Sequence, residues 1–221
     1  MKMLHTVTTE GTFVDLLHRA VNGDRILLCA EPFRSWDIHA EGVVIDRDGK
    51  FLINGETLIC EWGGREVDWN SHPQGVVIRD GKKFLLNGVT VLYEGLFEFS
   101  ACSPLGLFIE QPAGKFLRED GTTFYEGELA NDDEWLPHVQ GVVIAHEDML
   151  LLNGEQVLYW GEYEEWESHP NGVVIELDGK LLFNGTTVIY KGDCSGGWRS
   201  HPSGGVVIYD GDNLTLVVYK G

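Results

Sequence analysis

Residues 166–191 read Trp-Glu-Ser-His-Pro-Asn-Gly-Val-Val-Ile-Glu-Leu-Asp-Gly-Lys-Leu-Leu-Phe-Asn-Gly-Thr-Thr-Val-Ile-Tyr-Lys, and they decide the fold. Residues 169–172 predict a turn, because proline fixes φ and Asn-Gly accepts positive φ. Short apolar runs follow, separated by Asp178-Gly179 and Asn184-Gly185, dipeptides that join antiparallel strands in tight turns. The stretch therefore predicts a short strand around Trp166 and three firm strands after it.

The phrase Gly-Val-Val-Ile, or a near copy of it, occurs six times at nearly constant spacing. Self-similarity at a period of about 20–50 residues is typical of repeat architectures. A single antiparallel unit of this size cannot bury both of its faces, so each unit needs a copy of itself on either side. The copies begin at Gly42, Gly75, Gly106, Gly141, Gly172 and Gly205, in steps of 33, 31, 35, 31 and 33 residues.

The two ends of the chain favour a closed ring of these units. The chain ends on the apolar strand 214–219, which makes a poor polar cap for an open solenoid. The last two strands match the first and second firm strands of a unit, whereas Ile26–Leu28 matches the third and the segment around Trp36 the fourth. We therefore predict an all-β, six-bladed β-propeller over residues 24–221, closed by pairing of the terminal strands. Residues 1–23 are predicted to form an appended segment.

Two alternatives stay open at this stage. Gly11 lies 31 residues before Gly42 and is a possible seventh repeat start, which would give seven blades. Phe13, Leu16 and Leu17 lie at helical spacing. They predict a short helix, and a helix followed by a strand also resembles the capping segment of a right-handed parallel β-helix, the alternative fold.

The turn sequence resembles that of a known class of propellers. Residues 168–175, Ser-His-Pro-Asn-Gly-Val-Val-Ile, are similar to the Ser-Pro-Asp-Gly turn and following strand of TolB-type and related WD-like repeats. Similar turns recur at 71–75 and 200–204, and the resemblance extends over residues 24–221. The units here are shorter and carry a histidine before the proline. The resemblance implies a propeller that acts mainly as a binding platform.

Composition and charge exclude several functions. With 16 basic and 35 acidic residues, the formal net charge is −19. Such a surface repels phosphate backbones and anionic membranes, so we expect neither nucleic-acid nor membrane binding. The sequence lacks a run of ~20 apolar residues and an apolar leader, which predicts a cytoplasmic protein, and we expect a monomer. The acidity serves solubility, or it serves a basic partner or a cation.

The sequence offers no motif for catalysis or for a cofactor. It contains no nucleophile elbow, phosphate-binding loop, zinc-protease helix or dinucleotide fingerprint. The cysteines have neither zinc-site nor CxxC spacing, so we expect reduced structural thiols and no metal. These cysteines are Cys29, Cys60, Cys102 and Cys194.

Residues that recur in nearly every unit are predicted to build the blades. Each turn histidine is expected to bond locally and fix its turn, and each tryptophan is expected to wedge between neighbouring blades. The histidines are His39, His72, His138, His169 and His201, and the tryptophans are Trp36, Trp69, Trp135, Trp166 and Trp198.

Function is expected where the repeat is broken. Exposed aromatics beside an arginine are typical of binding hot spots, and residues 131–134 form an acidic insertion in the longest unit. We predict a non-catalytic module that binds a protein. One alternative is a carbohydrate-binding propeller with glycan clefts lined by Trp62, Trp160 or Tyr163, and a third possibility is a hydrolase whose site is the central channel. The candidate binding residues are Trp62, Arg65, Phe97, Phe99, Trp160, Tyr163 and Arg199.

Overall fold

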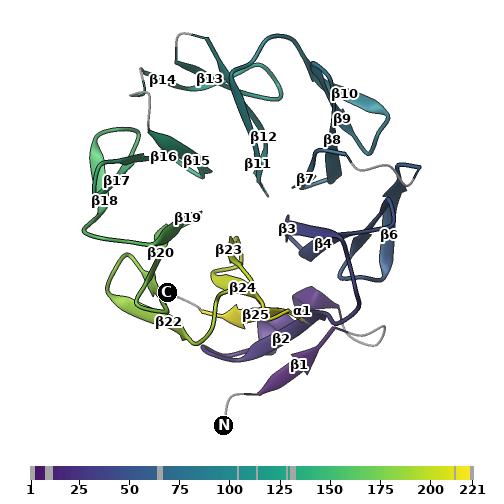
Figure 1. Cartoon of the computed structure of the whole chain (residues 1–221), viewed down its shortest axis with the longest axis vertical. Coiled ribbons are helices and arrows are strands. Elements are labelled where there is room, and N and C mark those ends of the chain that lie inside the picture. The colour runs from purple at the N-terminus through teal and green to yellow at the C-terminus, as the bar shows by residue number, and fades with distance from the viewer. Residues whose placement is uncertain are drawn as a thin grey trace.

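The structure is a ring of six antiparallel sheets around a central axis, as the sequence predicts (Figure 1). It is a computed structural model that describes residues 3–7, 12–63, 67–103, 105–112, 114–127, 129, 133–211 and 213–219. We number the blades 1 to 6 in chain order. In each blade the strand that contains or replaces the repeated tryptophan is the first one and lies nearest the axis, and the next strands follow outward.

Five blades are four-stranded meanders formed by consecutive strands. Blade 1 is β3 (Ser35–His39), β4 (Gly42–Arg47), β5 (Lys50–Ile53) and β6 (Thr57–Glu61); blade 2 is β7 (Trp69–His72), β8 (Gly75–Asp80), β9 (Lys83–Leu86) and β10 (Thr90–Glu94); blade 3 is β11 (Phe99–Ser103), β12 (Gly106–Gln111), β13 (Lys115–Arg118) and β14 (Thr123–Glu126); blade 4 is β15 (Glu134–His138), β16 (Gly141–His146), β17 (Met149–Leu152) and β18 (Gln156–Trp160); blade 5 is β19 (Glu165–His169), β20 (Gly172–Leu177), β21 (Lys180–Phe183) and β22 (Thr187–Lys191).

Blade 6 closes the ring with strands from both ends of the chain. It combines β23 (Trp198–His201), β24 (Gly205–Tyr209) and β25 (Leu214–Val218) with β2 (Arg25–Cys29), and β2 pairs antiparallel with β25. The prediction that the last strands also pair with the Trp36 segment is wrong by one strand. Trp36 lies in β3, the innermost strand of blade 1, because its hairpin to Gly42 keeps it beside β4.

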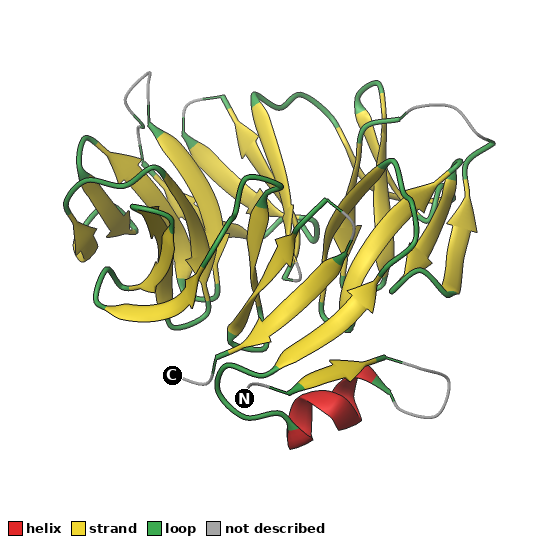
Figure 2. Cartoon of the chain, turned by 60° about the horizontal axis from the view of Figure 1, so that its bottom comes forward, coloured by secondary structure: helices red, strands yellow, loops and turns green. Residues whose placement is uncertain are grey.

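The N-terminal segment adds a strand and a helix to this blade. β1 (Leu4–Thr6) pairs parallel with β2 as a fifth strand. α1 (Phe13–Arg19) begins after Thr12, whose side chain accepts the amide N–H of Asp15, and it lies against one end of the ring (Figure 2). The described part of the chain therefore contains six blades, and neither the seven-bladed ring nor the parallel β-helix occurs. Among the described residues, no helix has the length and apolar character needed to span a bilayer.

The repeated glycine and asparagine explain why the unit recurs so regularly. In blade 1, Oδ1 of Asn54 accepts the amide N–H of Val43 at 3.0 Å. This bond ties the turn between the outer strands back to the start of β4. A methyl group at Gly42, where φ is +126°, would fall on that Asn54 oxygen, so the glycine is needed for space as well as for backbone conformation. Blades 2, 4 and 5 repeat the arrangement.

The repeated tryptophans lie between blades. Trp69 of blade 2 packs on Phe51 of blade 1, with ring centroids 4.8 Å apart, and Trp135 of blade 4 packs on Phe116 of blade 3 at the same distance. Trp166 and Trp198 join the clusters between blades 4 and 5 and between blades 5 and 6. The Gly-Val-Val-Ile strands are buried along their first four residues, so each blade is covered on both faces by its neighbours.

The closure gives a direct test of the fold. Deleting residues 214–221 removes β25 from the middle of blade 6, between β24 and β2. Because each blade depends on its neighbours, we expect the truncated protein to lose its single cooperative thermal transition, measured by circular dichroism and calorimetry. A truncated protein that melts cooperatively at the wild-type temperature would contradict closure through this strand.

Candidate functional site

The turn histidines form part of the framework on which the site is built. In five blades Nδ1 of the histidine accepts a backbone N–H two residues ahead, at 3.1–3.2 Å, which closes the turn after the innermost strand. Ser103 does the same in blade 3, where its hydroxyl accepts the N–H of Leu105. All five histidines are buried. Among the described residues, no three His, Cys, Asp or Glu side chains are placed so that they could hold a metal ion.

The other ring nitrogen joins some blades to their neighbours. Nε2 of His201 lies 3.0 Å from the carbonyl oxygen of His39, and Nε2 of His72 lies 2.8 Å from Oε2 of Glu119. Burial lowers the pKa of His169 and of His201 to about 4. These two imidazoles are therefore neutral at physiological pH, and that of His201 links blade 6 to blade 1.

A hollow of about 1090 Å³, which we call the chamber, lies along the axis of the ring. The innermost strands line it, and we call the lining residues at the start of those strands, among them Glu134 and Glu165, its rim. One position of the innermost strand, two residues before each turn residue, reaches the chamber in every blade. Its occupants are Asp37, Asn70, Ala101, Leu136, Glu167 and Arg199.

This position differs in all six blades, whereas the histidine and tryptophan beside it recur. Blades 5, 6, 1 and 2 contribute charged or polar groups, and blades 3 and 4 contribute Ala101 and Leu136. At this position the lining is therefore polar in four consecutive blades and apolar in the other two. A framework does not require such variation, so the position is a candidate for ligand recognition.

An ion pair joins blades 5 and 6 at this position. Nη1 of Arg199 lies 3.0 Å from Oε1 of Glu167. Burial raises the pKa of Glu167 to about 7, although Arg199 opposes the shift. Burial also raises the pKa of Asp37, whose carboxylate accepts the N–H groups of Ser71 at 2.7 Å and Ile38 at 2.8 Å. Two partly desolvated carboxyl groups thus face the chamber with one arginine.

Acidic side chains dominate the lining. It includes eight carboxylate residues and one arginine, so the chamber attracts cations and repels anions. Phe99, which is 51% exposed, and Tyr163 add aromatic surface, and the Phe99 ring lies 5.4 Å from that of Trp135. The carboxylate residues are Asp37, Glu98, Glu110, Asp133, Glu134, Glu164, Glu165 and Glu167.

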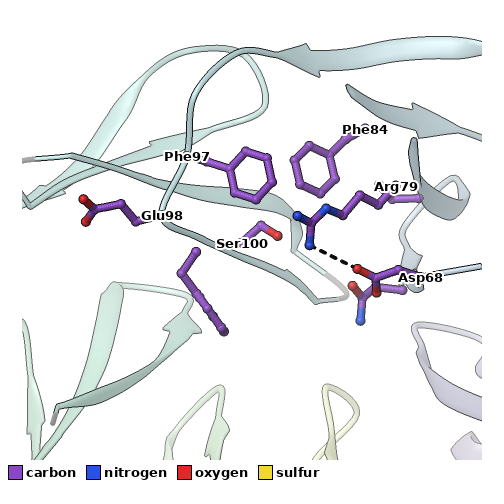
Figure 3. A pocket seen from close by; sticks show the side chains of 9 residues that line it. Asp68, Arg79, Phe84, Phe97, Glu98 and Ser100 are labelled. Carbon is purple, nitrogen blue, oxygen red and sulfur yellow. Dashed lines mark hydrogen bonds and ion pairs between the residues drawn. The ribbon is translucent and has the colours of Figure 1, made fainter. Parts of the chain in front are cut away.

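A smaller cavity of about 260 Å³, which we call the slot, adjoins the chamber between blades 2 and 3 (Figure 3). The tryptophan of the other innermost strands is replaced here by Ser100. The Phe97 ring packs 5.0 Å from that of Phe84, and the guanidinium carbon of Arg79 lies 4.9 Å from the Phe97 centroid. Asp68 pairs with Nη1 of Arg79 at 3.3 Å.

The structure brings four of the predicted binding residues together. Phe97 lines the slot, Phe99 lines both cavities, and Tyr163 and Arg199 line the chamber. The acidic insertion also reaches the chamber through Asp133 and Glu134, whereas residues 131 and 132 lie outside the described part of the chain.

The other predicted residues lie elsewhere. Trp62 packs over Gly88 in the cluster between blades 1 and 2, where it fills the place that tyrosines fill in other blades. Trp160 is 77% exposed at the end of β18, away from the chamber lining. Trp62, Trp160 and Tyr163, any of which could line a glycan cleft in the carbohydrate-binding alternative, thus lie in three different surroundings. Arg65 lies outside the described residues.

The cysteines are thiols, and burial raises the pKa of three of them. Cys102 lines the chamber, and its pKa lies well above the ordinary value because of burial and of nearby carboxylates such as Asp37. The pKa of Cys194 rises to about 11 for the same main reason, and that of Cys60 is also raised. A protonated thiol is a weak nucleophile, so Cys102 is a poor candidate for covalent catalysis.

The comparisons with known proteins add no family. No protein-family model, no curated protein and no solved structure matches this chain.

The buried histidines predict a pH dependence of stability. Since the pKa of His169 is about 4 in the folded protein and 6.5 is its ordinary value, the unfolded chain binds the proton first as pH falls. Stability is then complete above about pH 6.5 and is lost toward pH 4, by up to about 3 kcal/mol. We expect His169→Asn, whose oxygen replaces Nδ1 as acceptor, to reduce this loss by that amount.

Urea unfolding of both proteins between pH 7.5 and 4 measures the difference. Groups common to both, including Glu167, whose raised pKa acts in the opposite direction, cancel from it. Parallel pH profiles for the two proteins would show that His169 is not held neutral by burial.

Proposed function

We propose that the protein is a non-catalytic scaffold that binds a basic segment of another protein at the chamber. The observation that carries the proposal is the lining, in which eight carboxylate residues face one arginine. Charge of one sign around a concave site concentrates ligands of the opposite sign and speeds their association. The chamber thus selects the sign of its ligand.

Aromatic surface within the acidic lining favours a polypeptide over a bare cation. Phe99 and Tyr163 lie among the carboxylates, and the faces of aromatic rings attract lysine and arginine side chains. Ala101 and Leu136 offer apolar surface for the aliphatic stems of those side chains. A flexible basic segment entering the ring would contact both the carboxylates and this apolar surface.

Charge variants at the rim test this function. Glu134 and Glu165 are exposed and line the chamber, whereas Glu126 is exposed on the outer strand β14. With a fluorescein-labelled peptide of alternating lysine and glycine, we expect salt-sensitive binding by anisotropy. Glu134→Gln and Glu165→Gln each weaken it by about 0.2–1 kcal/mol, up to roughly fivefold in Kd.

Glu126→Gln is the matched control, since it removes the same charge away from the chamber and leaves the Kd nearly unchanged. Equal losses in all three variants would mean that the peptide senses only the net charge. If the lysine peptide does not bind at low salt, the proposed function is wrong.

Hydrolysis in the chamber is a second candidate, and one observation favours it. Glu167 occurs at its position in one blade alone, reaches the chamber and has a pKa of about 7, which suits a general acid. On the scaffold proposal, a panel of chromogenic glycosides and esters gives no turnover. Turnover that Glu167→Gln abolishes without lowering the melting temperature would instead establish the enzyme.

A further inference from the structure

The interface between blades 2 and 3 departs from the others in a coordinated way. The innermost strands of the five other blades carry a tryptophan against the preceding blade, and in two of those interfaces the indole N–H donates to a glutamate of that blade. Trp135 donates to Glu110 at 2.8 Å, and Trp198 donates to Glu176 at 2.7 Å. At the corresponding places the interface of blades 2 and 3 has Ser100 for the tryptophan and Arg79 for the glutamate. This interface therefore lacks both the indole donor and the carboxylate acceptor.

Phe97 replaces only part of the missing indole. Its ring lies 5.0 Å from Phe84, close to the 4.8 Å that separates Trp69 from Phe51 and Trp135 from Phe116. It comes from the segment before β11 and not from the strand itself, so a cavity of about 260 Å³ remains beside Ser100. The walls of this slot include Val77, Phe84, Phe97 and Phe99.

Rings occupy the corresponding space in the five other interfaces, which indicates the shape of the occupant. Its polarity is indicated by Arg79 and Asp68, which stand together at the edge of the slot (Figure 3). The guanidinium only donates hydrogen bonds and the carboxylate only accepts them. A phenol hydroxyl both donates and accepts, an indole N–H only donates, and a phenyl ring does neither.

We infer that the slot binds the phenol ring of a tyrosine side chain in the partner polypeptide, with its hydroxyl between Arg79 and Asp68. The slot adjoins the chamber, with which it shares Asn70, Glu98, Phe99 and Ser100. This inference rests on the proposed function for the source of the tyrosine. The basic residues of the same segment lie in the acidic chamber.

Four labelled peptides that differ at one position test the slot. They have the sequence Lys-Gly-X-Gly-Lys with blocked ends, where X is Tyr, Phe, Trp or Ala, and anisotropy gives the Kd of each. Because one net hydrogen bond separates tyrosine from phenylalanine and the pair is partly exposed, we expect the tyrosine peptide to bind about three- to tenfold more tightly. Arg79→Gln removes most of this ratio.

Ser100→Leu should fill the slot, and Ser100→Ala is the matched control that keeps it open. We expect Ser100→Leu to bring the tyrosine peptide to the affinity of the alanine peptide, while Ser100→Ala keeps the preference. Thermal melts establish that both variants are folded, and the Arg79→Gln ratio decides the matter if Ser100→Leu is not. Equal affinities of the four peptides for the wild type, or an unchanged preference in Arg79→Gln, would overturn the inference.

A neutral probe separates this inference from the proposed function. N-acetyltyrosinamide has no positive charge, and saturation-transfer NMR detects its binding. Binding that Ser100→Leu abolishes supports the slot, even if lysine peptides bind no better than neutral ones and the basic-segment proposal fails. Lysine peptides that bind equally with every X, together with no signal from the neutral probe, would refute the slot and leave the proposed function standing.

Discussion

No blade of this protein buries its own faces, and the rest of the structure depends on that constraint. The Gly-Val-Val-Ile strands are buried because the neighbouring blades cover them, and the tryptophan of one blade packs against the preceding blade. A chain of such units has two uncovered faces unless it closes. The pairing of β2 with β25 removes both, because it completes one blade from the two ends of the chain. The burial of apolar side chains in the blades therefore depends on the pairing of β2 with β25, two strands from opposite ends of the chain.

The same constraint separates framework from function. Positions that close a turn or touch a neighbouring blade have little freedom, so histidine, tryptophan, glycine and asparagine recur there. The chamber position beside the tryptophan faces the axis of the ring, and it holds six different residues. Residues that recur from blade to blade build and close the ring, and positions that vary between blades are the ones available for ligand recognition.

Much of the fold could be predicted from the sequence because its signals are local. The Asn-Gly and Asp-Gly turns have the positive φ values of tight hairpins, as at Asn184 with φ 47° and Gly185 with φ 69°. The closure followed from the phase of the repeats at the two ends. The assignment of Trp36 to blade 6 failed because the sequence shows the order of strands and not where one blade ends. The hairpin from His39 to Gly42 settles that boundary.

The site was less accessible to sequence reasoning, and the reason is geometric. Phe97, Phe99 and Arg199 are departures from the repeat that line the cavities, but Trp62 is also a departure, and it substitutes for a tyrosine in the core. A departure in sequence does not say whether a side chain points to a neighbouring blade or to the chamber. Asp37 and Glu167 were missed because acidic residues are common in this chain. Aligning the residue after each tryptophan would have revealed them, since it compares positions that share one direction in space. For a repeat protein, the informative comparison is thus between equivalent positions of its own units. The interface of blades 2 and 3 is the example: Ser100 stands where the other blades have a tryptophan, and Arg79 stands where two other blades have the glutamate that accepts the indole N–H.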